Sequence, residues 1–269
     1  MSNDIFNATL IARHDLTPDL SVVCICGDDG VVPDFQPGQF VTLGLPRPVE
    51  TIPALVEGRA PNGRLVRRAY SIASSPKERR YLELYVVLVE DGKLTPRLWN
   101  VEQGGRLYMD PRIRGEFTLG DVPSDSHIVL VATGTGVAPF ISMVRTYRDC
   151  NRWRRCTLVH GVREIEQLGY REEMEAIARE DQSFVYIPVV SGKTVAEQTW
   201  TGRRGRVQSL FNEAAFRELT SEPLVPEDTH VFLCGNPAMI VDVQTILESR
   251  GFITQTKSQP GNLHFERYW

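Results

Sequence analysis

The strongest constraint on the fold is a change of pattern at Val122-Pro123-Ser124-Asp125. Before this stretch, β-branched and aromatic residues gather in short runs that Pro, Gly and Asp separate. Several short strands at such spacing are typical of an antiparallel barrel or sandwich. The strand-like runs are 5–12, 20–26, 39–45, 65–73 and 81–89, with 106–110 and 116–119 as further candidates.

After this stretch, strand-like and helical runs alternate. The strand-like runs are 127–132, 156–162, 184–190, 230–234 and 252–258, and the helical runs are 139–150, 165–180, 205–219 and 237–250. Such alternation predicts a parallel sheet with helices on both faces, which binds ligands at the carboxyl ends of its strands. We therefore expect two domains, residues 1–121 and 122–269. The Pro-, Gly- and Arg-rich segment 46–66 fits either a loop or an extra hairpin.

Composition excludes several classes of function. The chain has 269 residues and a formal charge of -4, which argues against a general affinity for nucleic acid. No apolar run approaches the roughly 18 residues of a membrane helix, and the N-terminus lacks a signal-peptide pattern, so we expect a cytoplasmic protein. The five cysteines form no C-x-x-C pair and the five histidines are scattered, so we expect no metal site.

The stretch Arg68-Ala69-Tyr70-Ser71 carries four chemically different groups in four residues. In an extended chain, Arg68 and Tyr70 share one face and Ser71 lies on the other. A guanidinium can bind a diphosphate, a phenol ring can lie along a flavin, and a hydroxyl can hydrogen-bond the flavin's redox-active edge. Seen alone, the same residues also fit an ordinary half-buried strand.

Two glycine-containing stretches could bind phosphate. Gly134-x-Gly136-x-x-Pro139 follows an apolar strand and opens a helix, where backbone N–H groups are unpaired. The pattern departs from G-x-G-x-x-G, so it is not a Rossmann fingerprint. Gly92-Lys93-Leu94-Thr95 offers a turn, a cation and a hydroxyl, although a solvated turn is the simpler reading of these four residues alone.

Together with Cys234-Gly235-Asn236-Pro237 and the ending Phe265-Glu266-Arg267-Tyr268-Trp269, these stretches resemble the ferredoxin–NADP reductase family, and its bacterial branch in particular. The resemblance covers nearly the whole chain. It implies an antiparallel six-stranded FAD-binding barrel followed by a five-stranded parallel α/β NADP-binding domain. It also implies the cofactors FAD and NADP and the electron-transfer partners ferredoxin or flavodoxin. We expect a monomer.

The resemblance implies FAD contacts from both halves of the chain. The tail, residues 259–269, would return to the FAD. The implied FAD-binding residues are Arg68, Ala69, Tyr70, Ser71, Tyr85, Val86, Lys93, Leu94, Thr95, Thr135, Phe265 and Trp269.

The resemblance likewise implies an NADP site. Arg163 and Arg203 match family residues that hold the 2'-phosphate, and Lys193 lies where the family has a third arginine. Lysine is a point charge without the fork of arginine, so the strength of the NADP preference stays open. The implied NADP-binding residues are Gly134, Gly136, Arg163, Lys193, Arg203, Cys234 and Gly235.

For the reaction itself, the resemblance implies three catalytic residues, Ser71, Cys234 and Glu266, which orient the hydride donor against the flavin. Two alternatives stay open. One is an NADH-dependent flavin reductase or the reductase component of an oxygenase, and the absent cluster cysteines and the Arg163–Arg203 pair count mildly against it. The other is a nucleotide-binding interaction module without turnover.

Overall fold

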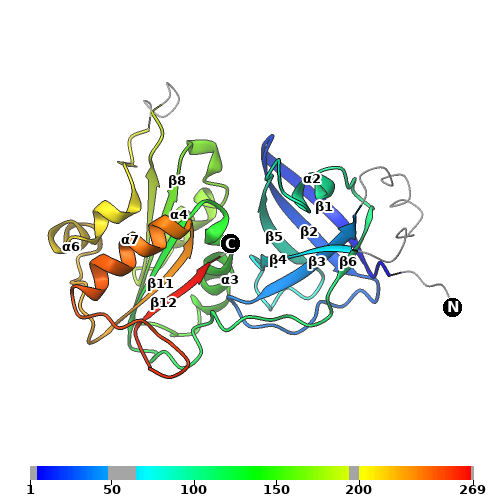
Figure 1. The fold of residues 1–269 in the computed structure, drawn as a ribbon. Coiled ribbons are helices and arrows are strands. Elements are labelled where there is room, and N and C mark those ends of the chain that lie inside the picture. The colour runs from blue at the N-terminus through cyan, green and yellow to red at the C-terminus, as the bar shows by residue number, and fades with distance from the viewer. Residues whose placement is uncertain (1–4, 48–64, 194–199, 268–269) are drawn as a thin grey trace. The chain divides into compact units, whose positions relative to one another are not determined.

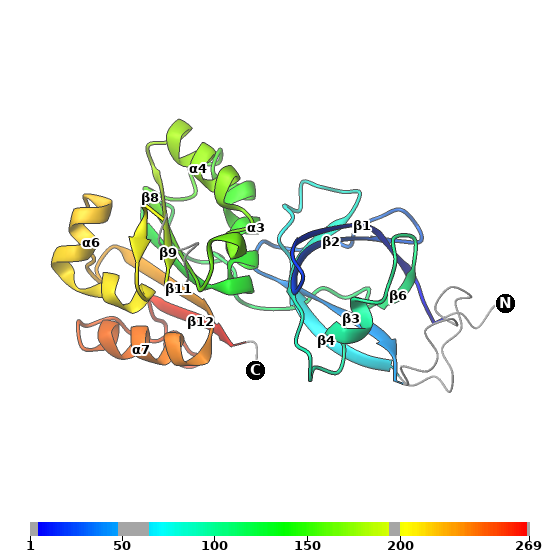
Figure 2. The ribbon, with the colours of Figure 1, turned by 90° about the horizontal axis from the view of Figure 1, so that it is seen from above.

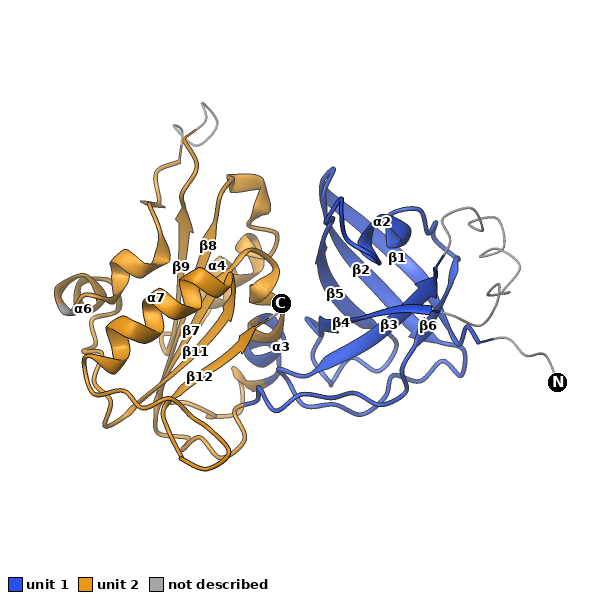
Figure 3. Cartoon of the chain, in the orientation of Figure 1, with its two compact units in different colours: residues 1–118, 141–146 blue, residues 119–140, 147–269 orange. Residues whose placement is uncertain are grey.

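The computed structural model describes residues 5–47, 65–193 and 200–267. Figure 3 shows the two compact units into which the chain divides. The first unit is Met1–Thr118 with Ile141–Thr146, and the second is Leu119–Phe140 with Tyr147–Trp269. Most of segment 46–66 lies outside the described residues.

In the described part of the first unit, six strands form an antiparallel sheet in the order β4-β3-β6-β1-β2-β5 (Figure 1). A bridge between Ile72 and Leu84 joins the β4 edge to the β5 edge, so the sheet closes into a barrel. The elements are β1 (Ala8–Thr17), β2 (Leu20–Gly27), β3 (Phe40–Pro46), β4 (Leu65–Ser71), β5 (Leu82–Val87), β6 (Arg106–Met109) and the short helix α2 (Thr95–Leu98).

The barrel forms because its strands alternate between buried and more exposed side chains. In β2, for example, Val23 and Ile25 are buried while Val22 and Cys24 are half-buried. The strand expected at 116–119 is wrong. Gly115 has a φ of 117°, and the Thr118 N–H bonds the Glu116 carbonyl only two residues back, so this stretch turns instead of extending.

In the described part of the second unit, six parallel strands run in the order β10-β9-β8-β7-β11-β12. The strands are β7 (His127–Thr133), β8 (Arg155–Val162), β9 (Phe184–Val190), β10 (Arg203–Arg204), β11 (Thr229–Gly235) and β12 (Leu263–Arg267). The helices are α3 (Ala138–Tyr147), α4 (Arg171–Glu180), α6 (Glu213–Thr220) and α7 (Pro237–Glu248), with 3-10 turns η3 (Gly134–Val137), η4 (Ile165–Gln167) and η5 (Val207–Phe211).

One face of the parallel sheet packs against η5, α6 and α7. Val129, Val231 and Leu233 of the sheet share a buried cluster with Phe216 of α6 and Ile240 of α7. Figure 2 shows α4 on the opposite face of the sheet. The predicted order of an antiparallel barrel followed by a parallel α/β sheet is therefore confirmed, and the two-residue β10 adds a strand to the sheet.

Three expected elements of the second unit are wrong in their bounds. The helix expected at 165–180 begins only at Arg171 as α4, after the 3-10 turn η4 and the non-helical residues 168–170. The strand expected at 252–258 is largely a loop, in which the Thr256 N–H bonds the Gln259 carbonyl, and the edge beside β11 is taken by β12. Phe252 and Leu263 are both buried in the same core cluster, on either side of this loop. The helix expected at 205–219 is broken at Asn212, whose extended backbone and side-chain bond to the Ala215 N–H begin α6.

Residues Ile141–Thr146 of α3 group with the first unit because their polar side chains bond the chain after β4. The Ser142 hydroxyl donates to the Ser74 carbonyl at 2.7 Å, and Arg145 pairs with Glu83 at 2.7 Å. Both arginine and glutamate are largely buried, so this ion pair is stronger than one in water. The two units are thus not separated by a single cut in the sequence.

We predict that acid destabilises the protein through buried histidines. His127 is fully buried, shares one hydrogen bond with Thr157, and has a pKa lowered by burial to about 4. The unfolded chain takes up this proton near pH 6.5, so the stability is fully present above that pH and is lost as the pH falls toward 4. Between pH 7 and pH 5, the free energy of unfolding measured in urea should fall for both proteins. The fall should be on the order of 1–2 kcal/mol smaller for His127→Gln than for the parent.

The control is His14→Gln, which changes an exposed histidine. An unchanged loss of stability between pH 7 and pH 5 in the His127 variant would contradict this account.

Candidate functional site

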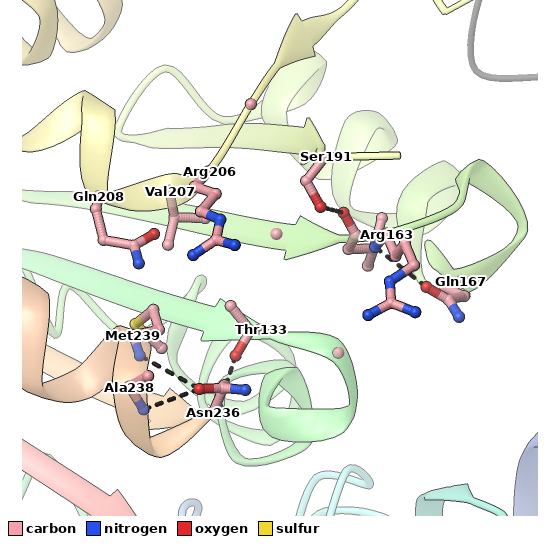
Figure 4. A pocket seen from close by; sticks show the side chains of 14 residues that line it. Thr133, Arg163, Gln167, Ser191, Arg206, Val207, Gln208, Asn236, Ala238 and Met239 are labelled. Atoms are coloured by element: carbon pink, nitrogen blue, oxygen red, sulfur yellow. Dashed lines mark hydrogen bonds between the residues drawn. The ribbon is translucent and has the colours of Figure 1, made fainter. Parts of the chain in front are cut away.

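A pocket of about 310 Å³ lies in the second unit, where β7, β8 and β9 end and α7 begins (Figure 4). This is the edge at which parallel α/β sheets bind ligands. Its lining residues are Thr133, Gly134, Gly161, Val162, Arg163, Gln167, Ser191, Gly205, Arg206, Val207, Gln208, Asn236, Ala238 and Met239.

Glycines allow the loops after β7 and β11 to touch through their backbones. A Cβ on Gly136 would lie 2.5 Å from the Cys234 carbonyl oxygen, closer than real Cβ atoms come. Gly235 has a φ of 126°, and a Cβ there would lie 2.4 Å from Thr133 Oγ1. That hydroxyl accepts the Asn236 N–H at 2.8 Å, which ties the two loops together.

The pocket is cationic. Arg163 and Arg206 are its charged residues, and none of the fourteen residues that line it in the described chain is acidic. Figure 4 shows both guanidinium groups pointing toward the side where Thr133 and Asn236 lie. Asn236 caps the twelve-residue helix α7, and its side chain accepts the Ala238 N–H at 2.8 Å. A helix start adds partial positive charge, so the arrangement favours a phosphorylated ligand.

Short backbone contacts place the two arginines. Arg163 follows β8, and its carbonyl accepts the Gly192 N–H at 2.8 Å from the segment after β9. Arg206 follows the two-residue strand β10, which pairs with Val189 and Val190 of β9. Gly205 then turns the chain with a φ of 108°, a backbone conformation that favours glycine, and its N–H bonds the Val190 carbonyl at 2.9 Å.

Trp200 anchors the segment that leads to Arg206. Its ring is buried, its indole Nε1–H donates to the Arg203 carbonyl at 2.9 Å, and the Arg171 guanidinium lies 4.7 Å from the ring centroid. A Cβ on Gly202 would lie 2.3 Å from this ring. The tryptophan thus fixes the turn that delivers β10 to the edge of the sheet.

The residues predicted from sequence for the 2'-phosphate do not all line this pocket. Arg163 does, but Arg203 lines a second hollow of about 430 Å³ and lies 3.7 Å from Glu218. Lys193 is exposed. The roles of Arg203 and Lys193 stay predictions.

Sequence reasoning missed Arg206. The available signal is a repeat, because Gly-Arg occurs at Gly202-Arg203 and again at Gly205-Arg206. The sequence-based prediction names Arg203 of the first pair, whereas the second pair, Gly205 and Arg206, lines the pocket. Ser191, Gln167 and Gln208 were also missed, since isolated polar residues after strands carry no distinctive pattern.

In the first unit, the predicted flavin residues lie on neighbouring strands at the barrel closure. Tyr70 and Ser71 end β4, while Tyr85 and Val86 lie in β5, and the Ile72–Leu84 bridge joins the two strands. Burial raises the pKa of the Tyr70 phenol, so the ring stays neutral. Tyr70 is half-buried, whereas Ser71, Tyr85 and Val86 are buried.

The charged part of this region is exposed. Arg68 and Ala69 are exposed, and the Arg68 guanidinium bonds the neighbouring Arg67 carbonyl at 2.8 Å. A guanidinium has five N–H donors, so this bond does not use all of them. The half-buried Tyr70 ring and the exposed Arg68 guanidinium fit the apolar ring and the anionic diphosphate of FAD.

The turn at Gly92–Thr95 is compact. Leu94 is packed in the barrel core, and the Thr95 hydroxyl donates to the Val89 carbonyl and accepts the Val89 N–H. These two side chains are therefore engaged within the protein. Lys93 is exposed.

The remaining predicted residues belong to the second unit. Thr135 lies in η3, and fully buried Cys234 pairs in register with half-buried Glu266 across β11 and β12. Phe265 packs against the buried cluster below α7, with the Arg267 guanidinium 4.7 Å from its ring centroid. Residues 263–267 of the predicted tail thus form β12, and Trp269 lies outside the described residues.

Among the described residues, no cluster of three or more His, Cys, Asp or Glu side chains could hold a metal ion. No described helix has the length and hydropathy needed to cross a membrane.

Comparison with known proteins identifies the family. Residues 130–245 match the model of the oxidoreductase NAD-binding domain. The flavodoxin/ferredoxin–NADP reductase of Escherichia coli is 32% identical over 236 residues, covering 87% of this chain and 88% of that protein. The ferredoxin–NADP reductase of Pseudomonas aeruginosa is 30% identical over 243 residues, covering 87% and 86%.

A solved structure agrees. The ferredoxin NADP+ reductase from Neisseria gonorrhoeae, with bound FAD and NADP, is 25% identical with a TM-score of 0.83, covering 98% of this chain and 99% of that chain. The chain therefore belongs to the ferredoxin–NADP reductase family.

We predict that Gly136→Ala lowers the stability of the protein more than Gly134→Ala does. The new Cβ at 136 meets the backbone of Cys234 and Gly235, whereas at 134 nothing lies within 4 Å and the cost is the φ of 54° alone. Urea unfolding should show a loss of about 3 kcal/mol for Gly136→Ala and about 1 kcal/mol for Gly134→Ala. Equal losses would contradict the contact between the two loops.

Proposed function

We propose that this protein is an FAD-containing ferredoxin– or flavodoxin–NADP reductase. It transfers hydride between NADP(H) and FAD, and single electrons between FAD and ferredoxin or flavodoxin. The observation that carries the proposal is the cationic pocket at the sheet edge, combined with membership of the family.

The pocket supports a dinucleotide that carries an extra phosphate. Arg163 and Arg206 project from different loops, as a tetrahedral phosphate dianion held on two sides requires. Ser191 and Gln208 add polar groups beside them. We assign the 2'-phosphate of NADP to the two arginines, and the diphosphate to the glycine turn at Gly134 and Gly136.

The barrel residues support FAD. Arg68 and Lys93 would hold the diphosphate, and Tyr70 would lie against the flavin, with Tyr85 and Val86 lining its edge. When bound, FAD converts the two-electron chemistry of NADP(H) into one-electron steps.

Three further residues complete the proposed chemistry. We infer that Ser71, Cys234 and Glu266 orient the nicotinamide against the flavin, since Cys234 and Glu266 share one register position at the end of the sheet. We also propose contacts of Thr135, Phe265 and Trp269 with FAD. Monomeric state and a cytoplasmic location stay predictions.

The direct test is an absorbance spectrum of the purified protein, taken anaerobically before and after adding NADPH or NADH. The proposal expects a yellow protein that NADPH bleaches faster than NADH does. A yellow protein that prefers NADH would favour a flavin reductase or an oxygenase reductase component. A colourless protein that takes up no FAD would favour an interaction module.

We predict that Arg206→Ala raises the KM for NADPH about ten- to a hundredfold, because it removes a charge-assisted hydrogen bond to the 2'-phosphate. The KM for NADH, which lacks that phosphate, should change by less than about twofold. The measurement is NADPH and NADH oxidation with ferricyanide as acceptor.

Arg203→Ala is the matched control, since it removes the same charge three positions earlier and outside the pocket. A larger effect on NADPH from Arg203→Ala than from Arg206→Ala would restore the sequence-based prediction and contradict the pocket.

We predict that Cys234→Ser slows hydride transfer about three- to tenfold. The serine oxygen is smaller than the cysteine sulfur, so the nicotinamide can shift slightly from its reactive position. FAD binding should not change, since FAD is held mainly by the barrel. Stopped-flow reduction by NADPH measures the first quantity and FAD titration the second. A parental rate of reduction would remove Cys234 from the site.

A further inference from the structure

A buried histidine contacts the phosphate turn from the neighbouring strand. His160 lies in β8, is fully buried, and places Nε2 3.1 Å from the Gly134 carbonyl oxygen. Gly134 follows β7 directly and begins η3 with a φ of 54°. The contact therefore falls on the first residue of the turn.

The hydrogen-bond partners define which ring nitrogen carries the proton. A carbonyl oxygen only accepts, so Nε2 must donate to Gly134. Nδ1 lies 3.4 Å from the Tyr186 hydroxyl of β9, which can donate to it, although this bond is long. Burial lowers the pKa of His160 to about 4, so the ring is neutral and carries one proton, at Nε2.

The bond fixes the direction of the next backbone donor. The peptide joining Gly134 and Thr135 is trans, so its N–H points opposite to its C=O. With the carbonyl held toward the buried imidazole, the Thr135 N–H points away from it. Glycine allows this peptide to rotate more readily than other residues do, so a fixed carbonyl restricts the turn.

We propose that His160 is a positioning residue for the nucleotide site, which holds the Gly134–Thr135 peptide so that its N–H can donate to the dinucleotide diphosphate. This role rests on the function proposed above. His160 does not itself touch the nucleotide.

The first test is nitrogen-15 NMR of the FAD-loaded parent protein at pH 7. The account expects a protonated, pyrrole-type Nε2 and an unprotonated, pyridine-type Nδ1 for His160. An Nδ1–H tautomer or a doubly protonated ring overturns the role. This measurement needs no variant and no NADP+, so it can be made even if a substitution prevents folding.

The second test compares two amide substitutions. In His160→Gln the side-chain NH2 can occupy the position of Nε2, whereas in His160→Asn the amide reaches only the position of Nδ1. His160→Asn should weaken NADP+ binding about tenfold, and His160→Gln should restore most of it. Binding of 2'-AMP, which lacks the diphosphate, should stay within about twofold in both variants.

The outcomes separate the two proposals. Equal losses for NADP+ and 2'-AMP, or no difference between the Asn and Gln variants, overturn the positioning role. A parent protein that binds no NADP+ overturns the proposed function and this role with it. An Nδ1–H tautomer in a parent protein that binds NADP+ overturns only the role of His160.

Discussion

The parallel pairing of β7 with β8 and β11 is the constraint on which the nucleotide site depends. Strands that run in one direction bring their carboxyl ends to one edge, so Thr133, Val162 and Gly235 end neighbouring strands of the sheet. The loops that follow must share that edge, and they fit because Gly136 and Gly235 lack side chains. Gly136 and Gly235 are themselves buried, while Gly134 beside them lines the pocket. The close packing of these two loops therefore shapes the edge at which the pocket lies.

The positively charged residues at this edge lie in the loops that follow the strands. Arg163 and Arg206 follow β8 and β10, and both are exposed, so neither charge is buried without a partner. A ligand that excludes water from the pocket would strengthen their attraction. The lining holds no acidic residue within the described chain, so no internal ion pair competes for the arginines there. The pocket is therefore positively charged before an anion binds.

The sequence predicts the architecture well because the two halves carry different hydrophobic periods. It fails where local pattern and tertiary pairing disagree. Residues 252–258 look like a strand, and Phe252 packs in the core, but the chain turns at Thr256 and Leu263–Arg267 pairs with β11 instead. Arg206 was missed for a related reason. Arg203, Arg204 and Arg206 are nearly adjacent in sequence, and only the pairing of β10 with β9 and the turn at Gly205 separate them in space.

The central claim is that the extra phosphate of NADP binds between Arg163 and Arg206. A crystal structure of the protein with FAD and NADP+ tests it directly. The account predicts the 2'-phosphate within hydrogen-bonding distance of both guanidinium groups. A 2'-phosphate held by Arg203 and Lys193, or lying outside the pocket, would contradict it.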